Sequence, residues 1–140
     1  MFLPLAAAEG ISASVNAPDE VAPDSDFVAT VDIGMVVSLN AIQYDISFDP
    51  SVLRLDDMTA GQLDSTGIPV QFNEISPGRY RVVQSMGLDT VSGSGYLAVL
   101  HFHTLTVGQS EINLSNGLLS GMEAEIPATW IGDSILVATE

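Results

Sequence analysis

Two histidines are the side chains of this sequence with the clearest capacity for metal chemistry. His101 and His103 stand two positions apart in the apolar stretch "LAVLHFHTL". Residues two apart on a β-strand point to the same face, so both imidazole rings would emerge side by side, as some metal sites require. A third ligand would have to come from a neighbouring strand, and the sequence identifies none. We therefore interpret the pair as part of a solvated polar face.

Acidic side chains form two further groups of candidate ligands. One is the pair Asp56-Asp57, and the other comprises Asp19, Glu20, Asp24 and Asp26. Carboxylate oxygens suit Ca²⁺, but neither group has the spacing of an EF-hand loop. From the sequence alone we assign no metal ligand and no cofactor to this chain.

The sequence contains no recognisable catalytic motif. It has no cysteine, no Gly-x-Ser-x-Gly elbow, no His-Glu-x-x-His segment and no Walker loop. The paired carboxylates of a glycoside hydrolase cannot be picked out among eighteen Asp and Glu residues without a cleft to align them. We predict no catalytic residues and no enzyme activity.

The charge balance argues against two classes of partner. Eighteen acidic residues face only three basic ones, which gives a formal net charge of −15. Such a field repels phosphate backbones and anionic lipids, and three arginines can hardly build a basic patch. We predict no binding to nucleic acid and no direct insertion into a membrane, since nothing beyond the N-terminus approaches the length of a span.

The elements that must position these side chains are β-strands. Apolar and polar residues alternate along most of the chain, and no amphipathic helix is credible. The expected strands cover residues 11–15, 27–33, 39–49, 70–74, 79–85, 96–105, 110–119 and 128–138, with a further strand starting at Val52. Turn signals separate them, including Pro77-Gly78 and the "SGSG" of residues 92–95. The prediction is an all-β domain of about nine strands, a two-sheet sandwich in preference to a closed barrel.

The alternation also predicts the core. Ile42, Tyr44, Ile46 and Phe48 share one face of the strand 39–49, and Phe102 lies on the apolar phase of the strand 96–105. We expect these side chains between the two sheets. The first residues, "MFLPLAAAEG", resemble the end of a secretory leader. We expect residues 1–9 to be a leader remnant or tail, and residues 10–140 to be one domain.

Four segments, taken in order, resemble the cohesin module of cellulosomal scaffold proteins. They are "SFDPSVLRL", with its aromatic-Asp-Pro-x-x-Leu pattern, "MTAGQL", "SGSGYLAVLHFHTL" and "GDSILV". The resemblance implies a nine-stranded jelly roll that binds dockerin modules through the face formed by strands eight, three, six and five. It also implies a secreted or cell-surface protein of a prokaryote, with a role in scaffolding extracellular complexes. Calcium is then expected on the dockerin partner.

The resemblance and the residues together indicate one binding face. The Asn and Asp that the family places two apart on strand three correspond to Ala41 and Gln43, so that hydrogen-bonding pair is replaced here. Arginine is rarely buried unpaired, so the face of the strand 79–85 that carries two arginines should point outward. The predicted partner-binding residues are Ala41, Gln43, Asp45, Arg79, Arg81 and Val83. Alternatively, the arginines only pair across strands and offset the acidic surface.

Two other functions fit the same fold class. A carbohydrate-binding module stacks sugar rings on a strip of exposed aromatic side chains. Here Trp130 stands alone, Tyr44 and Tyr96 fall on predicted core faces, and Tyr80 faces away from the arginines. Sugar binding is therefore disfavoured. An inert spacer domain of a cell-surface protein stays open as the other alternative.

Overall fold

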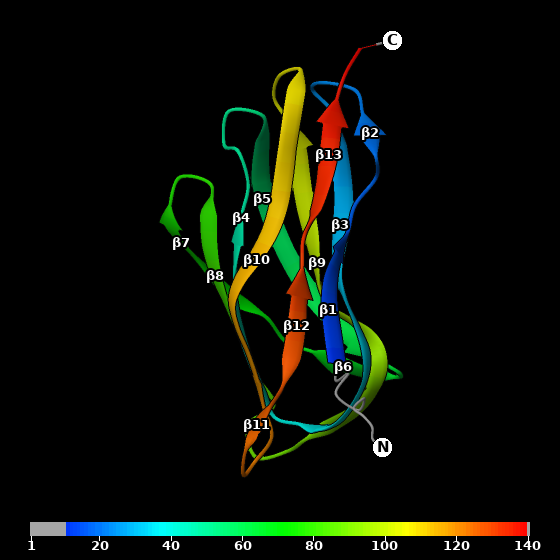
Figure 1. Ribbon diagram of the computed structural model, residues 1–140, viewed down its shortest axis with the longest axis vertical. Helices are drawn as coiled ribbons and strands as arrows, with labels where there is room; N and C mark the ends of the chain where they lie inside the picture. The colour runs from blue at the N-terminus through cyan, green and yellow to red at the C-terminus, as the bar shows by residue number, and fades with distance from the viewer. Residues whose placement is uncertain (1–10, 140) are drawn as a thin grey trace, which may run out of the picture.

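The computed structural model describes residues 11–139 as two β-sheets packed face to face (Figure 1). One sheet has six strands in the order β12-β1-β3-β9-β5-β6. The other has seven strands, six of them in the order β2-β13-β10-β4-β8-β7 and the seventh, β11, paired with β10. No helix in this part of the chain is long and apolar enough to cross a membrane. The all-β sandwich is thus confirmed, while the expected leader at residues 1–9 lies outside the described residues.

The structure has thirteen strand segments in the described residues, where the sequence predicted about nine strands. The six-stranded sheet contains β1 (Ile11–Asn16), β3 (Asp26–Leu39), β5 (Leu53–Leu63), β6 (Thr66–Ile68), β9 (Val91–Thr104) and β12 (Ala128–Ile131). The seven-stranded sheet contains β2 (Glu20–Val21), β4 (Ala41–Ser47), β7 (Gln71–Ser76), β8 (Arg79–Ser85), β10 (Gly108–Ser120) and β13 (Asp133–Val137). Additionally, β11 (Glu125–Ile126) pairs with β10. The extra segments are the very short β2, β6 and β11 and the division of the last strand into β12 and β13.

The last strand changes sheets at Gly132. β12 pairs parallel with β1 in one sheet, and β13 pairs antiparallel with β10 in the other. A Cβ at position 132 would lie 2.7 Å from the carbonyl oxygen of Ile112. The close approach of the two backbones therefore needs glycine at this point, and the strand expected at 128–138 is divided there.

The core is made of apolar side chains from both sheets. Tyr44 and Phe102 are almost fully buried, as the alternation predicts, and Phe102 stacks on Phe27 with ring centroids 5.3 Å apart. Phe48 is a correction, because it is only half-buried. It follows the last residue of β4, so its ring lies at the margin of the core, 5.2 Å from Phe102 and 6.0 Å from Tyr80.

Irregular pairing accounts for two further corrections. The "SGSG" segment is not a turn but the first part of β9, because Gly93 and Gly95 both pair with residues of β3. The backbone is irregular there, with positive φ angles of 133° at Gly93 and 155° at Gly95. Next to it, Leu97 is skipped in the register between β3 and β9. This bulge reverses the alternation, so Leu97 is buried and Tyr96 is not part of the core.

A buried amide links the two sheets beneath the candidate site. Gln84, on the inner face of β8, is 1% exposed. Its side-chain Nε2 donates to the carbonyl oxygens of Leu97, at 2.8 Å, and Pro69, at 3.1 Å, while its Oε1 accepts from the Tyr44 hydroxyl at 3.2 Å. Because Leu97 belongs to the opposite sheet, this network fixes the position of β4 and β8 against β9.

Candidate partner-binding site

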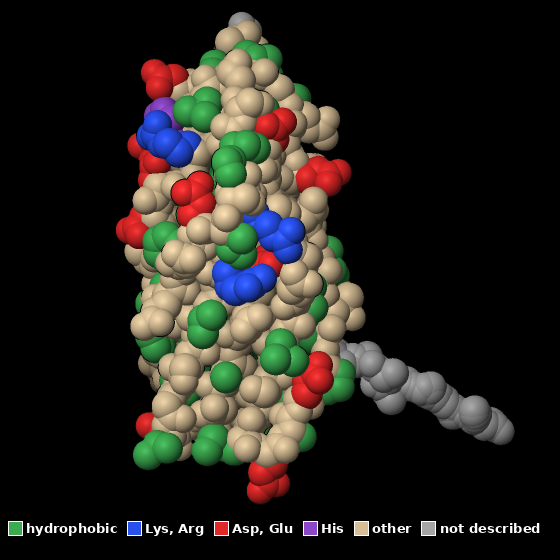
Figure 2. All heavy atoms as spheres, turned by 90° about the vertical axis from the view of Figure 1, so that its left-hand side faces the viewer, with side chains coloured by type: hydrophobic (Ala, Val, Ile, Leu, Met, Phe, Trp, Pro, Cys, Tyr) green, Lys and Arg blue, Asp and Glu red, His purple; other side chains and the backbone are tan. Residues whose placement is uncertain are grey.

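The outer surface of β10, β4, β8 and β7 is a continuous face of the sandwich (Figure 2). The register places the predicted residues in rows across these strands. Asp45 pairs with Arg81, and Gln43 pairs with Val83. Ser47 pairs with Arg79, and Ala41 pairs with Ser85. All six predicted site residues therefore lie on two adjacent strands, three at alternate positions of β4 and three at alternate positions of β8.

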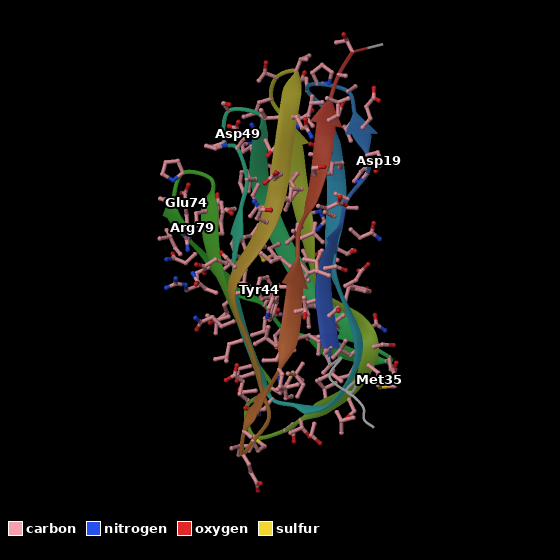
Figure 3. All side chains as sticks on the ribbon, in the orientation of Figure 1. Asp19, Met35, Tyr44, Asp49, Glu74 and Arg79 are labelled. Atoms are coloured by element: carbon pink, nitrogen blue, oxygen red, sulfur yellow. The ribbon has the colours of Figure 1, made fainter. Side chains whose placement is uncertain are left out.

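A charged cluster lies at the centre of this face. Arg81 donates to both carboxylate oxygens of Asp45, from Nε at 2.9 Å and from Nη2 at 3.1 Å. Arg79 donates from Nη2 at 2.8 Å, and the side-chain amide of Asn116 donates at 3.0 Å. We call these four residues the Asp45 cluster. The arginine side chains appear as adjacent blue groups in the middle of Figure 2, and Figure 3 shows Arg79 on the outer side of β8.

The Asp45 carboxylate is fully covered, whereas the arginines are not. The Asp45 side chain has 0% exposure, against 42% for Arg79 and 46% for Arg81. Hydrogen bonds from Arg81, and then from Arg79 and Asn116, hold the pKa of Asp45 well below its usual range. Asp45 is therefore ionised at neutral pH. With two guanidinium groups around one carboxylate, the cluster carries a net positive charge on a chain of net charge −15.

Burial changes the role expected for Asp45. Its outward phase on β4 predicted direct contact with a partner, but its oxygens are already occupied by donors from this chain. Asp45 instead fixes the rotamers of two arginines whose outer surfaces stay accessible. The cross-strand pairing that the alternative interpretation expected is thus present, and it leaves the guanidinium groups ordered and half exposed.

Asn116 reaches the cluster because β10 is irregular at this point. The register between β10 and β4 shifts between Ser115 and Leu118, and Asn116 has a φ angle of 53°. Gly117 is required beside it, because a Cβ there would collide with the Trp130 ring. Sequence reasoning did not assign Asn116 to the site. The available signal is the Asn-Gly pair inside a strand, since Asn tolerates positive φ and Gly permits close packing.

Exposed apolar side chains surround the charged cluster. Val83, among the predicted residues, is 42% exposed, and Leu118 on β10 is equally exposed. On the edge strand β7, Phe72 and Ile75 are 38% and 45% exposed. A shallow hollow of about 300 Å³ lies here, lined by Gln71, Phe72, Asn73, Ile75, Arg81 and Val83. The family resemblance placed this strand in the binding face, but sequence reasoning named none of its residues, because all residues of β7 are exposed and no inward-facing set marks its two sides.

This face has the composition of a recognition surface. Arginine and aromatic side chains are enriched in protein interfaces, and ordered arginines with accessible donors can form charge-assisted hydrogen bonds. Both histidines belong to β9 in the other sheet, and the Asp45 carboxylate is covered by the side chains that donate to it. The face therefore offers binding groups without an evident acid–base pair.

Most of the other candidate ligands lie on or beside the six-stranded sheet, whereas Asp19 and Glu20 lie at β2 in the seven-stranded sheet. His103 contacts Asp24 and Asp26, whereas His101 contacts Thr59 through Nε2 at 3.0 Å. Asp56 pairs with Arg54. Asp19 and Glu20 belong to the segment around β2 and do not join this group, and the Asp57 carboxylate accepts from the backbone of Met58.

Comparison with known proteins supports the architecture and its family. The chain has 15% identity to a non-cellulosomal cohesin of the archaeon Archaeoglobus fulgidus, with a TM-score of 0.78 over 93% of this chain and 92% of that one. A cohesin module from a family 33 glycoside hydrolase of Clostridium perfringens gives 14% identity and a TM-score of 0.81, covering 94% and 98% of the two chains.

A third structure shows a relative of the same fold in a complex. It is the sixth cohesin of scaffoldin B from Acetivibrio cellulolyticus, solved with a Cel5 dockerin mutant, at 16% identity and a TM-score of 0.79 over 92% and 99% of the chains. No curated protein matches this chain. A family model described as the cohesin domain matches residues 11–136, which covers both sheets from β1 into β13, so the chain belongs to the cohesin domain family.

Proposed function

We propose that this chain is a non-catalytic module that binds a dockerin through the outer face of β10, β4, β8 and β7. The observation that carries the proposal is the Asp45 cluster, in which a saturated, buried carboxylate holds two half-exposed arginines at the centre of that face. The complex of the Acetivibrio cellulolyticus cohesin with a dockerin supports the choice of partner class.

The site residues divide into anchors and surroundings. Arg81 is the central anchor, because it lies in the middle of β8 and also lines the hollow beside β7. Val83 and the exposed Gln43 supply an apolar and an amide contact next to it, and the small Ala41 leaves room for a partner side chain. Asp45 acts indirectly by holding Arg79 and Arg81 in place, which reduces the entropy that the arginines lose on binding.

The setting of the module is the second part of the proposal. A secreted or cell-surface protein of a prokaryote fits the family, and binding would assemble an extracellular multi-protein complex. The partner would bring its own calcium. Cohesins from a non-cellulosomal archaeal protein and from a glycoside hydrolase indicate that such a complex need not be built on a cellulosomal scaffold. Sugar binding is not proposed, because Trp130 packs against Tyr44 with ring centroids 5.4 Å apart.

Calorimetric titration with dockerin modules from the same source, with and without calcium, tests the proposal. Arg81→Ala should weaken binding about tenfold or more, because charge-assisted hydrogen bonds are worth about 1.5–3 kcal/mol and 1.4 kcal/mol is a factor of ten. Arg54→Ala is the matched control, since Arg54 lies on β5 in the opposite sheet. Equal losses would indicate a diffuse charge effect, and unchanged binding by Arg81→Ala would remove this face from consideration.

A further inference from the structure

Three side chains with metal-ligating atoms converge on the outer surface of the six-stranded sheet. One ligand atom each from Asp26, Asp56 and His103 lies within 4.8 Å of the other two. The residues come from the adjacent strands β3, β5 and β9, where Asp26 and Arg54 both pair with His103. Asp56 is the residue skipped in the register between β5 and β9, and a bulge of this kind re-aims a side chain.

His103 is held in an orientation that suits a metal ligand. Its imidazole is 19% exposed, with Nδ1 2.6 Å from an Asp26 oxygen and Nε2 2.9 Å from an Asp24 oxygen. Histidines that bind metals usually donate the other ring N–H to a carboxylate, which fixes the tautomer. Here Asp24 can accept the Nε2 proton. The Nδ1 lone pair then faces Asp26, with Asp56 close by.

The local field also favours a cation. The carboxylates of Asp26 and Asp24 lie 2.6 and 2.9 Å from the two ring nitrogens of His103, so negative charge surrounds this position. Arg54 is the nearby basic side chain, and its Nε lies 2.6 Å from Asp56. A carboxylate has two oxygens, so Asp56 can keep this ion pair and offer its second oxygen.

The surface beside two of the three side chains, Asp26 and Asp56, is hollowed. Asp26, Asp56 and His101 are among the residues that line a hollow of about 390 Å³ on this sheet. Asp26 is 82% exposed and Asp56 is 39% exposed, so both carboxylates can adjust toward an ion. Zinc sites with three protein ligands keep an open position for water, and the hollow provides the space for it.

We propose that Asp26, Asp56 and His103 bind a divalent cation of the Zn²⁺ class, with Asp24 as the outer carboxylate that orients His103. One imidazole and two carboxylates suit Zn²⁺, whereas Ca²⁺ and Mg²⁺ prefer oxygen ligands alone. The site ties β3, β5 and β9 together on the sheet that faces away from the Asp45 cluster. The inference is therefore independent of the proposed partner binding, and it revises the interpretation of the histidines as a solvated polar face.

Calorimetric titration of the EDTA-treated chain with ZnCl₂ tests this site, together with ¹⁵N imidazole NMR shifts of both histidines. We expect one saturable site with His103 as the shifted ring. His103→Ala and Asp26→Asn should weaken Zn²⁺ binding about tenfold or more, and Asp24→Asn by about 10–100-fold, as for other outer carboxylates. His101→Ala, two residues along the same strand, should bind as the wild type does. Arg54→Ala should strengthen binding, because it removes an opposing charge.

Three results would overturn the proposal. They are the absence of saturable Zn²⁺ binding, equal losses from His101→Ala and His103→Ala, and weaker binding by Arg54→Ala. Circular dichroism checks that each variant is folded. If His103→Ala does not fold, Asp26→Asn decides, because it replaces an exposed side chain with one of the same shape.

Discussion

Substituting Asp45 by Asn tests whether this carboxylate organises the candidate binding face. The carboxylate accepts three hydrogen bonds from Arg79 and Arg81 and one from Asn116. A neutral amide of the same shape cannot serve as a bidentate acceptor for Arg81, and its NH₂ group would face guanidinium donors. The variant should therefore lose stability and leave both arginines mobile.

The expected size of the loss follows from burial and exposure. Hydrogen bonds to charged groups contribute about 1.5–3 kcal/mol each, but the values within one cluster do not add. The two arginines are 42% and 46% exposed, so water replaces part of what they lose. We expect a loss of about 2–3 kcal/mol at neutral pH, below the 3–5 kcal/mol typical of breaking a fully buried pair. In urea this shifts the unfolding midpoint by about 1–2 M.

The pH dependence of this loss has a defined sign. The Arg81 guanidinium, followed by that of Arg79, lowers the pKa of Asp45 from its ordinary value of 3.8. The stabilisation is thus fully present above that value and is lost as the pH falls through the folded-state pKa. Below about pH 4, the difference between wild type and Asp45→Asn should shrink by about 1.4 kcal/mol per pH unit.

Urea unfolding from pH 7 to pH 2.5 measures this difference, with Asp89→Asn as the control. Asp89 is exposed on the loop after β8, so its substitution should change the free energy of unfolding by less than about 0.5 kcal/mol. The reasoning is refuted if Asp45→Asn is as stable as the wild type at pH 7. It is also refuted if the difference in stability does not decrease with acidification.

Two further predictions concern the core. Gln84→Ala leaves the Tyr44 hydroxyl and the Leu97 carbonyl without their buried partner. The free energy of unfolding measured in urea should therefore fall by about 1–3 kcal/mol or more. The control, Gln43→Ala at an exposed position, should lower it by less than about 0.5 kcal/mol. Phe102→Ala should lower the free energy of unfolding by about 3–5 kcal/mol, and Phe48→Ala, at a half-buried position, by about half as much. Thermal unfolding compares the two variants. Equal decreases in melting temperature would show that Phe48 belongs to the core and not to its margin.

The sequence predicts the faces of β4 and β8 well, because a period of two follows directly from strand geometry. Tyr44 points inward and Gln43 outward, as expected, and β8 has the bounds that its pattern gave, Arg79–Ser85. That these strands are neighbours came from the family resemblance and is borne out by the register. Alternation assigns each residue to a face but does not say which strands pair.

Irregular positions are where the pattern fails. Asn116 enters the Asp45 cluster through a register shift in β10 that depends on Trp130 packing over Gly117, a contact between distant segments. The zinc-class site likewise combines Asp26, Asp56 and His103 from three strands, and a bulge places Asp56 among them. Asp26, Asp56 and His103 were each identified separately in the sequence as candidate ligands, whereas Asn116 was not identified. Their convergence depends on tertiary pairing, which no local pattern contains.

The distribution of charge bears on how a partner would be selected. A net charge of −15 repels an acidic partner at long range, but this repulsion is screened beyond about 10 Å at 0.1 M salt. At contact, the same partner meets two ordered guanidinium groups, and the Asp45 carboxylate that they share is buried beneath them. A carboxylate on the partner would therefore be attracted only when it reaches the Asp45 cluster in the correct register. Because attraction is confined to that point, the cluster favours specificity of docking more than speed of association.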